Sequence, residues 1–483
     1  SLGMDDRLEG RKELIAGIVA NINGGTYDSE GLRKCWEIVL HNQFHDILPG
    51  SSIKQVYDLC DIDYKKVADY CNTLFESKIG NIVSNLNTDG GVFVYNPLGF
   101  EISGPVKLDG KTVETTEVIP SSGWKVLKSV NDKCDVSING LTAENKYYKM
   151  TVDNAGRIAS LFDKRVGREV FLNGTCGNEL QIFEDYPREY DAWEISDYYK
   201  DKMWVLDSDA EIEPIFDGTR AGFKVTRKYY NSTITQNIWL YSECSRIDFE
   251  NDIDWHEDHQ LLKASFPLDV HASSATYEIQ YGHFERPTHQ NNSWDRAKFE
   301  TCGHKWVDIS DNNYGVALLN DCKYGHSAEG TTLKLTMLKC ATWPNPEADQ
   351  GKHVFTYSLM PHVGDLRDSG VIKSAYLLNQ PMVAENVAAN TGKLADNYSL
   401  ASCDKDNVII ECVKKAENDD NMIVRLYDAY NRRTNATVTV PDVFKEAYLC
   451  NMLEENIEKL DLKDGKVTVD VSNFEIVTVK FVR

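Results

Sequence analysis

The chain carries at residues 41–52 the stretch HNQFHDILPGSS, which separates two helical patterns. The pattern before it predicts a helix over about residues 29–46. Pro49 and Gly50 end this helix, because proline cannot continue the hydrogen-bond ladder and glycine accepts the turn. The stretch therefore predicts a reversal between two antiparallel helices.

Two further patterns place this reversal inside a bundle. Ser52 followed by Gln55 has the spacing of a capping box, which predicts that a helix begins there. The apolar stripe of that helix is carried by Val56, Cys60, Tyr64, Val67, Cys71, Leu74, Ile79 and Ile82. An earlier stripe over residues 8–22 stops at two glycines. Residues 1–90 are therefore predicted as a three-helix bundle.

The hydrophobic period changes from about 3.6 to 2 after residue 91, so strands are expected to the end of the chain. Strands are predicted at 92–95, 147–152, 158–162, 234–241, 247–255, 467–471 and 476–482. The turn at 153–156 makes the second and third of these a hairpin. Many antiparallel strands of this kind predict stacked β-sandwiches, with domain boundaries near 90, 138 and 375.

Composition excludes several classes of protein. Among the 483 residues, 52 Lys and Arg stand against 75 Asp and Glu, a net charge of −23, and 42% are hydrophobic. A nucleic-acid partner is excluded because so acidic a chain repels phosphate backbones, and an anionic membrane surface is excluded for the same reason. No stretch approaches the ~20 apolar residues of a membrane span. The twelve cysteines are scattered without metal-site spacing, so we expect reduced thiols and a cytoplasmic protein.

The first candidate for chemistry is the pair His45 and Asp46. His41 and His45 are four residues apart and would share a helix face. A neutral imidazole is a good zinc ligand, and a carboxylate can bind metal or accept a sugar hydroxyl. The alternative is a histidine that caps the negative end of the helix, with Asp46 solvated. Spacing alone favours this alternative, because short motifs often match by chance.

Other candidates also allow two interpretations. The loop at residues 184–193 is rich in polar and aromatic side chains, so it is either a surface on which sugars stack or a loop packed on the bundle. Residues 256–259 could suit a metal, but a polar turn between two strands is favoured. Arg286 and Asp295 form either a sugar clamp or an ion pair, and the ion pair is favoured.

Several longer motifs carry a family resemblance. The stretch NQFHDILPGSSI at residues 42–53 resembles the signature of glycoside hydrolase family 38 α-mannosidases, in the branch with bacterial and eukaryotic cytosolic members. Motifs similar to that branch follow in order at 183–185 with 191–193, 286–289 with 293–295, 304–306 and 314–325. The resemblance runs from near residue 10 to the end of the chain.

The resemblance implies roles for individual residues. His45 is expected to be one ligand of a zinc or another divalent cation, and Asp46 to contact hydroxyls of bound mannose. Phe44 stands where other branches of the family carry a further histidine. We also expect Asp191 and Trp193 to contact the substrate. The family's catalytic barrel, with the nucleophile and the other metal ligands, would lie upstream, so no catalytic residue is expected in this chain and its metal site is expected to be incomplete.

The predicted fold is α+β and multidomain. A three-helix bundle (1–90) precedes a small β domain (91–138), a large galactose-mutarotase-like β-sandwich (139–375) and a C-terminal β-sandwich (376–483). The predicted function is the C-terminal part of a retaining, metal-dependent α-mannosidase that removes terminal α-linked mannose from oligosaccharides. It would act with the missing N-terminal catalytic domain and be inactive alone, and family members often assemble, so a homo-oligomer is expected too. The alternative is a stand-alone, non-catalytic carbohydrate-binding or scaffolding β protein with a helical assembly domain.

Overall fold

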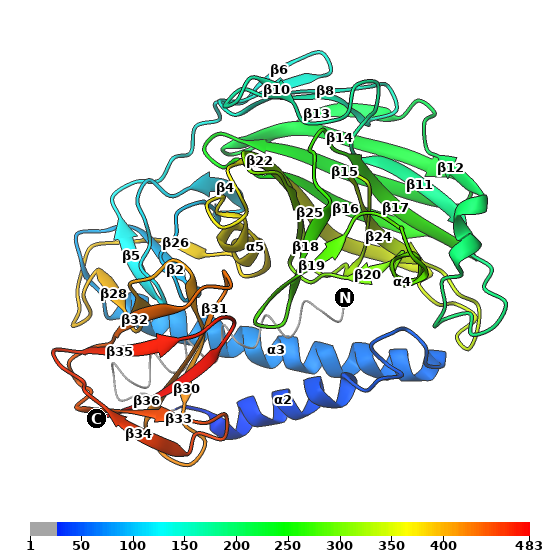
Figure 1. Ribbon diagram of the computed structural model, residues 1–483. Coiled ribbons are helices and arrows are strands. Elements are labelled where there is room, and N and C mark those ends of the chain that lie inside the picture. Colours follow the sequence, from blue (N-terminus) through cyan, green and yellow to red (C-terminus); the bar gives the residue numbers. More distant parts are fainter. Residues whose placement is uncertain (1–26) are drawn as a thin grey trace.

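The computed structural model describes residues 27–483, in which two antiparallel helices lead into several β-sheets (Figure 1). The helices are α2 (Ser29–Asn42) and α3 (Lys54–Ser84). The helix predicted at residues 8–22 lies outside the described residues. A hydrophobic core joins the pair, and its buried members are Cys35, Val39, Ile47, Cys60, Tyr64, Val67 and Cys71.

The predicted helix ends need correction. α2 ends at Asn42, four residues before the predicted end, and the residues that follow form turns. α3 begins at Lys54 with Ile53 as its N-cap, and no side chain caps it. The capping-box prediction is therefore wrong. Ser52 Oγ instead donates a hydrogen bond to the Asp46 carbonyl at 2.6 Å, which tightens the turn between the helices.

The largest body is a β-sandwich, as predicted. Its nine-stranded sheet has the order β13 (Glu211–Asp217), β14 (Arg220–Tyr229), β15 (Ser232–Tyr241), β16 (Ile247–Trp255), β25 (Gly351–Val363), β22 (Tyr314–Asn320), β21 (Trp306–Ser310), β18 (Ser274–Ile279) and β19 (Gly282–Pro287). Alternating side chains of these strands, such as Phe223 and Val225, are buried in one core with residues of two further sheets.

Two smaller sheets share that core. One contains β12 (Met203–Val205), β11 (Glu179–Glu184), β17 (Gln260–Pro267), β24 (Thr332–Lys339), β23 (Gly325–Glu329) and β20 (Thr301–Cys302). The other contains β10 (Arg168–Glu169), β9 (Ile158–Asp163), β8 (Tyr148–Val152), β7 (Thr142–Glu144) and β6 (Ser137–Asn139). The antiparallel pairing of β8 with β9 confirms the predicted hairpin.

A six-stranded sheet crosses the boundary expected near residue 375. It contains β28 (Asn397–Ser399), β5 (Gly123–Leu127), β2 (Gly91–Asn96), β26 (Val383–Val387), β3 (Pro105–Leu108) and β4 (Lys111–Glu114). Strands from both sides of the large sandwich therefore share one sheet. Helix α5 (Val371–Asn379) packs between this sheet and the outer face of the nine-stranded sheet, where Val371, Ala375 and Tyr376 are buried with Trp306.

The chain ends in a second, smaller sandwich, again as predicted. One sheet contains β30 (Val408–Lys415), β31 (Met422–Asp428), β36 (Ile476–Val482), β33 (Glu446–Cys450) and β34 (Asn456–Leu460). The other contains β29 (Ser402–Cys403), β32 (Thr434–Thr439) and β35 (Lys466–Val471). Ile79 and Ile82 at the end of α3 are buried in the same core, so the helix pair is anchored at that end.

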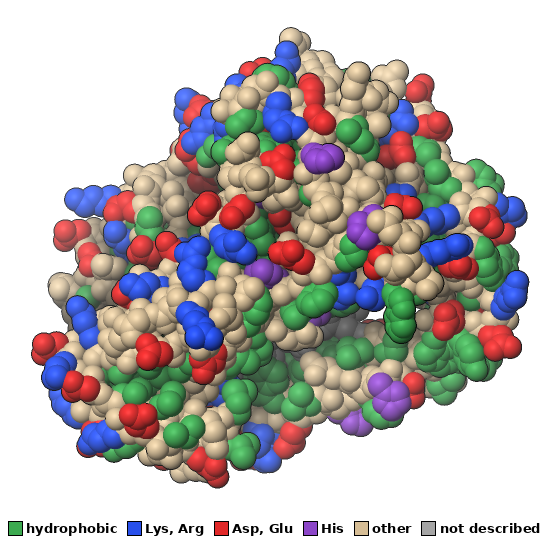
Figure 2. Space-filling view, in the orientation of Figure 1, with side chains coloured by type: hydrophobic (Ala, Val, Ile, Leu, Met, Phe, Trp, Pro, Cys, Tyr) green, Lys and Arg blue, Asp and Glu red, His purple; other side chains and the backbone are tan. Residues whose placement is uncertain are grey.

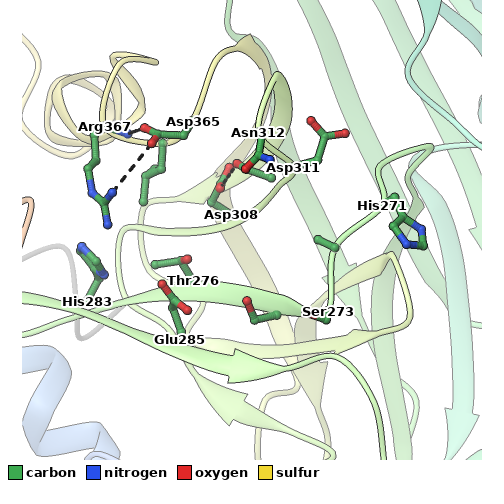
Figure 3. Close-up of a pocket in the computed structure, with 14 residues that line it drawn as sticks. His271, Ser273, Thr276, His283, Glu285, Asp308, Asp311, Asn312, Asp365 and Arg367 are labelled. Atoms are coloured by element: carbon green, nitrogen blue, oxygen red, sulfur yellow. Dashed lines mark hydrogen bonds and ion pairs between the residues drawn. The ribbon is translucent and has the colours of Figure 1, made fainter.

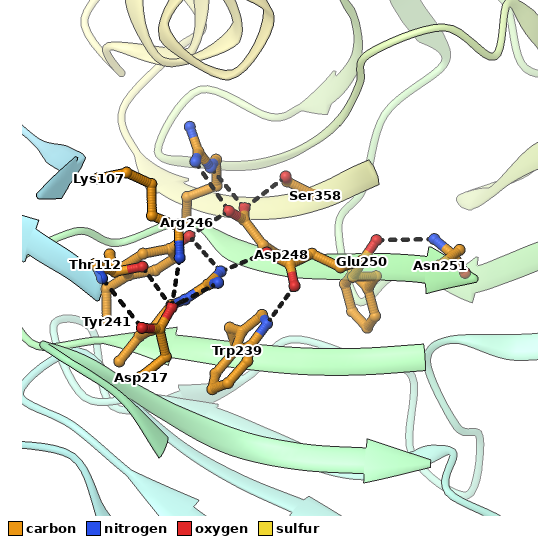
Figure 4. A network of polar contacts seen from close by, with 12 residues as sticks. Lys107, Thr112, Asp217, Trp239, Tyr241, Arg246, Asp248, Glu250, Asn251 and Ser358 are labelled. Carbon is orange, nitrogen blue, oxygen red and sulfur yellow. Dashed lines mark hydrogen bonds and ion pairs between the residues drawn. The ribbon is translucent and has the colours of Figure 1, made fainter. Parts of the chain in front are cut away.

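A polar network joins the large sandwich to the six-stranded sheet (Figure 4). Asp217 at the end of β13 accepts hydrogen bonds from Lys107 Nζ at 2.6 Å and from Thr112 Oγ1 at 2.7 Å, both on the other sheet. Arg246 and Asp248 form a buried ion pair close by, at 2.6 Å. Within residues 27–483 no helix is both long and apolar enough to cross a membrane.

Candidate functional site

The turn between α2 and α3, residues 43–53, presents His45 and Asp46 to solvent. Their side chains are 77% and 47% exposed, and His45 Nε2 lies 3.6 Å from Asp46 Oδ2. The Phe44 ring lies against the imidazole, with centroids 4.1 Å apart. Histidine side chains lie exposed over the outer end of the helix pair, with hydrophobic side chains beside them (Figure 2). His45 follows α2 instead of belonging to it, so the predicted shared helix face with His41 is wrong.

Hydrogen bonds hold the backbone of the turn that carries His45 and Asp46. The Asp46 carbonyl accepts from the Ser52 hydroxyl, and Ser52 N–H donates to Tyr57 Oη at 2.9 Å. Ile47 is 7% exposed and anchors the turn in the helix core. Burial raises the pKa of Tyr57, so its hydroxyl stays protonated. Asp46 is thus held through its main chain, and its carboxylate remains available.

The described residues supply only some of the ligands that the metal implied by the resemblance needs. Zinc takes four ligands in structural sites and three protein ligands in catalytic ones. His45 and Asp46 offer one nitrogen and one carboxylate. Across residues 27–483 no group of three or more His, Cys, Asp or Glu is arranged to hold a metal ion. These residues do not by themselves make a zinc site.

The loop between β11 and β12 contains the other two predicted substrate contacts, and the structure places them differently. Asp191 is only 16% exposed. Its Oδ2 accepts hydrogen bonds from the backbone N–H groups of Thr342 at 2.7 Å and Trp343 at 3.2 Å. Trp193 is 43% exposed, and its ring lies 5.8 Å from that of Trp343. Asp191 is therefore engaged with protein backbone, whereas Trp193 faces solvent.

His259 joins this loop to the segment after β24. Its Nδ1 lies 3.2 Å from the Asp185 carbonyl, and its Nε2 lies 3.0 Å from Thr342 Oγ1. The Tyr186 ring stacks on the imidazole at 4.2 Å. Residues 256–259 connect β16 to β17, which confirms the polar-turn interpretation. Both ring nitrogens have protein neighbours, so this histidine organises loops.

The segment after β24 also reaches the helix turn. Lys54 Nζ, on the first residue of α3, lies 3.7 Å from Glu347 Oε2. In Figure 1 the loop that follows β24 lies beside the turn between α2 and α3. Three segments far apart in sequence, at 43–54, 185–193 and 342–347, are thus linked at one edge of the molecule. Sequence reasoning had no signal for the third segment, because its role depends on contacts with the other two.

Arg286 and Asp295 do not pair, so that favoured interpretation is wrong. The Arg286 guanidinium lies over the rings of Tyr277 and Phe284, at 5.5 and 5.2 Å. Asp295 instead accepts a hydrogen bond from Asn292 Nδ2 at 2.6 Å. Asp295 lies in the short helix α4 (Ser293–Ala297), which Asn292 caps, and its Oδ2 also lies 3.6 Å from His289 Nδ1.

Two cavities lie elsewhere on the molecule. One, of about 360 Å³, opens at the edge of the nine-stranded sheet, and its lining includes His283, Glu285, Asp308, Asp365 and Arg367 (Figure 3). Burial, reinforced by Arg367, lowers the pKa of His283 to about 4, so this imidazole is neutral at pH 7. The other, of about 820 Å³, lies between the large sandwich, the six-stranded sheet and α5. Neither lining includes His45, Asp46, Asp191 or Trp193.

Comparison with known families gives three matches along the chain. Residues 6–82 match the alpha mannosidase middle domain. Residues 143–347 match the glycosyl hydrolases family 38 C-terminal domain, and residues 407–479 match the family 38 C-terminal beta sandwich domain. These ranges together take in more than half of the chain and follow the order of the bodies seen in the structure.

Individual relatives agree. Alpha-mannosidase 2C1 of Homo sapiens is 32% identical over 94% of this chain, and alpha-mannosidase G of Dictyostelium discoideum is 31% identical over 94%. The chain spans about half the length of these curated relatives, 46% and 48%. An alpha-mannosidase structure from Enterococcus faecalis V583 superposes with a TM-score of 0.84 at 16% identity, covering 99% of this chain and 66% of that one, which supports the fold. The chain belongs to glycoside hydrolase family 38 and carries the middle and C-terminal domains of that family.

Proposed function

We propose that this chain forms the middle and C-terminal domains of a retaining α-mannosidase that hydrolyses terminal α-linked mannose from oligosaccharides. The observation that carries the proposal is the exposed pair His45 and Asp46 on a rigid turn, in a chain whose curated relatives are α-mannosidases. His45 supplies one nitrogen ligand to a zinc or another divalent ion. Asp46 and Trp193 contact the sugar.

A partner domain completes the site in this proposal. Large apolar side chains of this turn and of the end of α2 are half exposed or more among the described residues: Leu40, Phe44, Leu48 and Ile53. An apolar patch beside a polar pair is typical of a surface that another domain covers. The relatives have about as much sequence again as this chain, which is room for such a domain.

In this proposal the steps of hydrolysis are divided between this chain and the partner domain. Retaining glycosidases use one carboxylate as nucleophile and another as acid and base, and the proposal assigns neither role to this chain. A bound divalent cation would orient the hydroxyls of the sugar. Asp46 accepts hydrogen bonds from those hydroxyls, and its fixed backbone limits the entropy lost when the sugar is held in one orientation.

The test is made in a longer protein that includes a catalytic domain. We expect His45→Ala to lower hydrolysis of an aryl α-mannoside at least about 100-fold and to lower bound metal as well, because losing a ligand costs more than the 10–100-fold typical of its supporting residues. Asp46→Asn should lower activity and leave metal content unchanged.

His41→Ala is the matched control, because His41 is an exposed histidine in the last turn of α2. It should keep both activity and metal. Full activity of His45→Ala at normal metal content would exclude the assigned role.

The redox state of the twelve cysteines bears on the cellular compartment in which the protein works. All of them lie among the described residues and are thiols that are not joined in disulfides. Thiols persist in reducing compartments, and this supports a cytoplasmic location in the proposal.

A further inference from the structure

Three aromatic side chains form an exposed platform beside the helix turn. Tyr190, Trp193 and Trp343 are 61%, 43% and 60% exposed. The Trp193 ring lies 5.8 Å from that of Trp343 and meets that of Tyr190 edge-on at 6.4 Å. We propose that this platform stacks a pyranose ring of a bound oligosaccharide, with Trp343 as a direct contact and Asp191 as the residue that positions it. The substrate class rests on the proposed function.

Asp191 holds the segment that carries Trp343. One carboxylate oxygen accepts from two successive backbone N–H groups, those of Thr342 and Trp343. Hydrogen bonds to a charged acceptor are among the stronger ones in proteins. His259 adds a contact to Thr342 Oγ1. The Trp343 backbone is therefore fixed before any ligand arrives, which reduces the ordering cost of binding.

The character of the surface favours a sugar over a protein partner. The three rings expose roughly 400 Å² if a whole aromatic side chain presents ~200–250 Å², whereas a protein interface uses about 800 Å² from each partner. Each ring also carries a polar N–H or O–H group, so its flat face can cover the C–H face of a pyranose while its edge hydrogen-bonds to hydroxyls.

The position of the platform suits a sugar beyond the terminal one. Glu347, four residues after Trp343, contacts Lys54 at the base of the helix turn. An oligosaccharide whose terminal residue lies at Asp46 would run over this linked segment. Trp343 would then act on longer substrates and leave a monosaccharide derivative unaffected.

The experiment observes the indole N–H signals of this chain by NMR while α-linked mannotriose is added at millimolar concentration. We expect the signals of Trp193 and Trp343, assigned from their Phe variants, to shift. Trp343→Ala should weaken binding about tenfold, a loss of about 1.4 kcal/mol that lies within the range of a single aromatic contact. Trp294→Ala is the matched control, because Trp294 is 79% exposed on α4 and outside the platform. It should bind as the unchanged chain does.

Asp191 is tested by rescue. Asp191→Ala should lose the shift of the Trp343 signal, and Asp191→Asn, which keeps an oxygen acceptor, should restore most of it. Unchanged mannotriose binding in Trp343→Ala or in Asp191→Ala would overturn the proposal. So would a dimer of this chain that Trp343→Ala dissociates, because the platform would then be a protein interface. His45→Ala should leave the indole shifts intact, so failure of the mannosidase proposal and failure of the platform are distinguishable.

Discussion

Single residues in this protein take their roles from what surrounds them. Asp46 and Asp191 are both aspartates next to aromatic or histidine residues in sequence, yet one is 47% exposed and the other 16%. The difference lies in backbone partners: two N–H groups of the 342–343 segment meet the Asp191 carboxylate. A buried carboxylate without such partners has its pKa raised, because burial disfavours the charged form.

Glu114, on β4, gives a test of that last effect. Burial raises its pKa from 4.5 to about 7, although it accepts the Glu243 N–H at 3.1 Å. Between those two pH values the unfolded chain has lost the proton that the folded chain retains. The free energy of unfolding should therefore fall as pH rises through this window, by up to about 3 kcal/mol.

Glu114→Gln should remove this dependence, because a neutral amide still accepts the N–H. Thermal unfolding at pH 8 should show the variant to be more stable than the parent, and at pH 4 the two should be equal. Glu117→Gln, on an exposed carboxylate of the same region, serves as control. Equal stability of Glu114→Gln and parent at pH 8 would contradict the raised pKa.

At the scale of elements, close approach between strands depends on small residues. Gly315 on β22 lies opposite His362 on β25 and Ser310 on β21. A Cβ at this glycine would come within 2.2 Å of Ser310 Oγ and 2.5 Å of His362 Nε2. The missing side chain leaves room for the buried hydrogen bond between His362 Nε2 and Asp308 Oδ1, at 2.8 Å.

Gly315→Ala should therefore lower the free energy of unfolding by about 1–3 kcal/mol, the usual cost of overpacking. Gly80→Ala is the contrasting variant, since a Cβ there meets nothing within 4 Å and the residue lies inside α3. Urea denaturation should show it to be more stable by about 0.5–1 kcal/mol. A Gly315→Ala protein as stable as the parent would mean that β22 and its neighbours shift freely.

At the scale of the whole molecule, polar contacts fix the large sandwich against the six-stranded sheet. Asp217 accepts from Lys107 and Thr112 across the junction between the large sandwich and the six-stranded sheet (Figure 4). Burial alone would raise the pKa of Asp217, but these hydrogen bonds and Arg220 outweigh it, and the pKa is lowered. A lowered pKa in the folded state means that the carboxylate stabilises the fold above pH 4 and loses that contribution as pH falls further.

Asp217→Asn should lower the free energy of unfolding by about 1–3 kcal/mol at pH 7, and the difference should shrink below pH 4. Calorimetry over pH 3–7 would follow it, with Asp209→Asn, an exposed aspartate before β13, as control. A difference that stays constant down to pH 3 would show that the charge of Asp217 is not what links the two bodies.

Local patterns predicted much of the fold. The hairpin of β8 and β9 follows from alternating side chains and a turn signal, both contained in about fifteen residues. The family resemblance likewise rests on contiguous motifs, and the family matches bear it out. The capping-box prediction failed because the Ser52 hydroxyl donates to the Asp46 carbonyl and no side chain caps α3.

What the sequence by itself determined was the order of helical and strand regions and the family, since periodicity and motifs are properties of neighbouring residues. Only the tertiary structure decided that residues 383–399 complete the sheet of β2 and β5, and that Asp191 is buried against the backbone of Trp343. Those outcomes depend on hydrogen bonds between segments more than 150 residues apart, and no local pattern specifies which partner a distant strand or loop will meet.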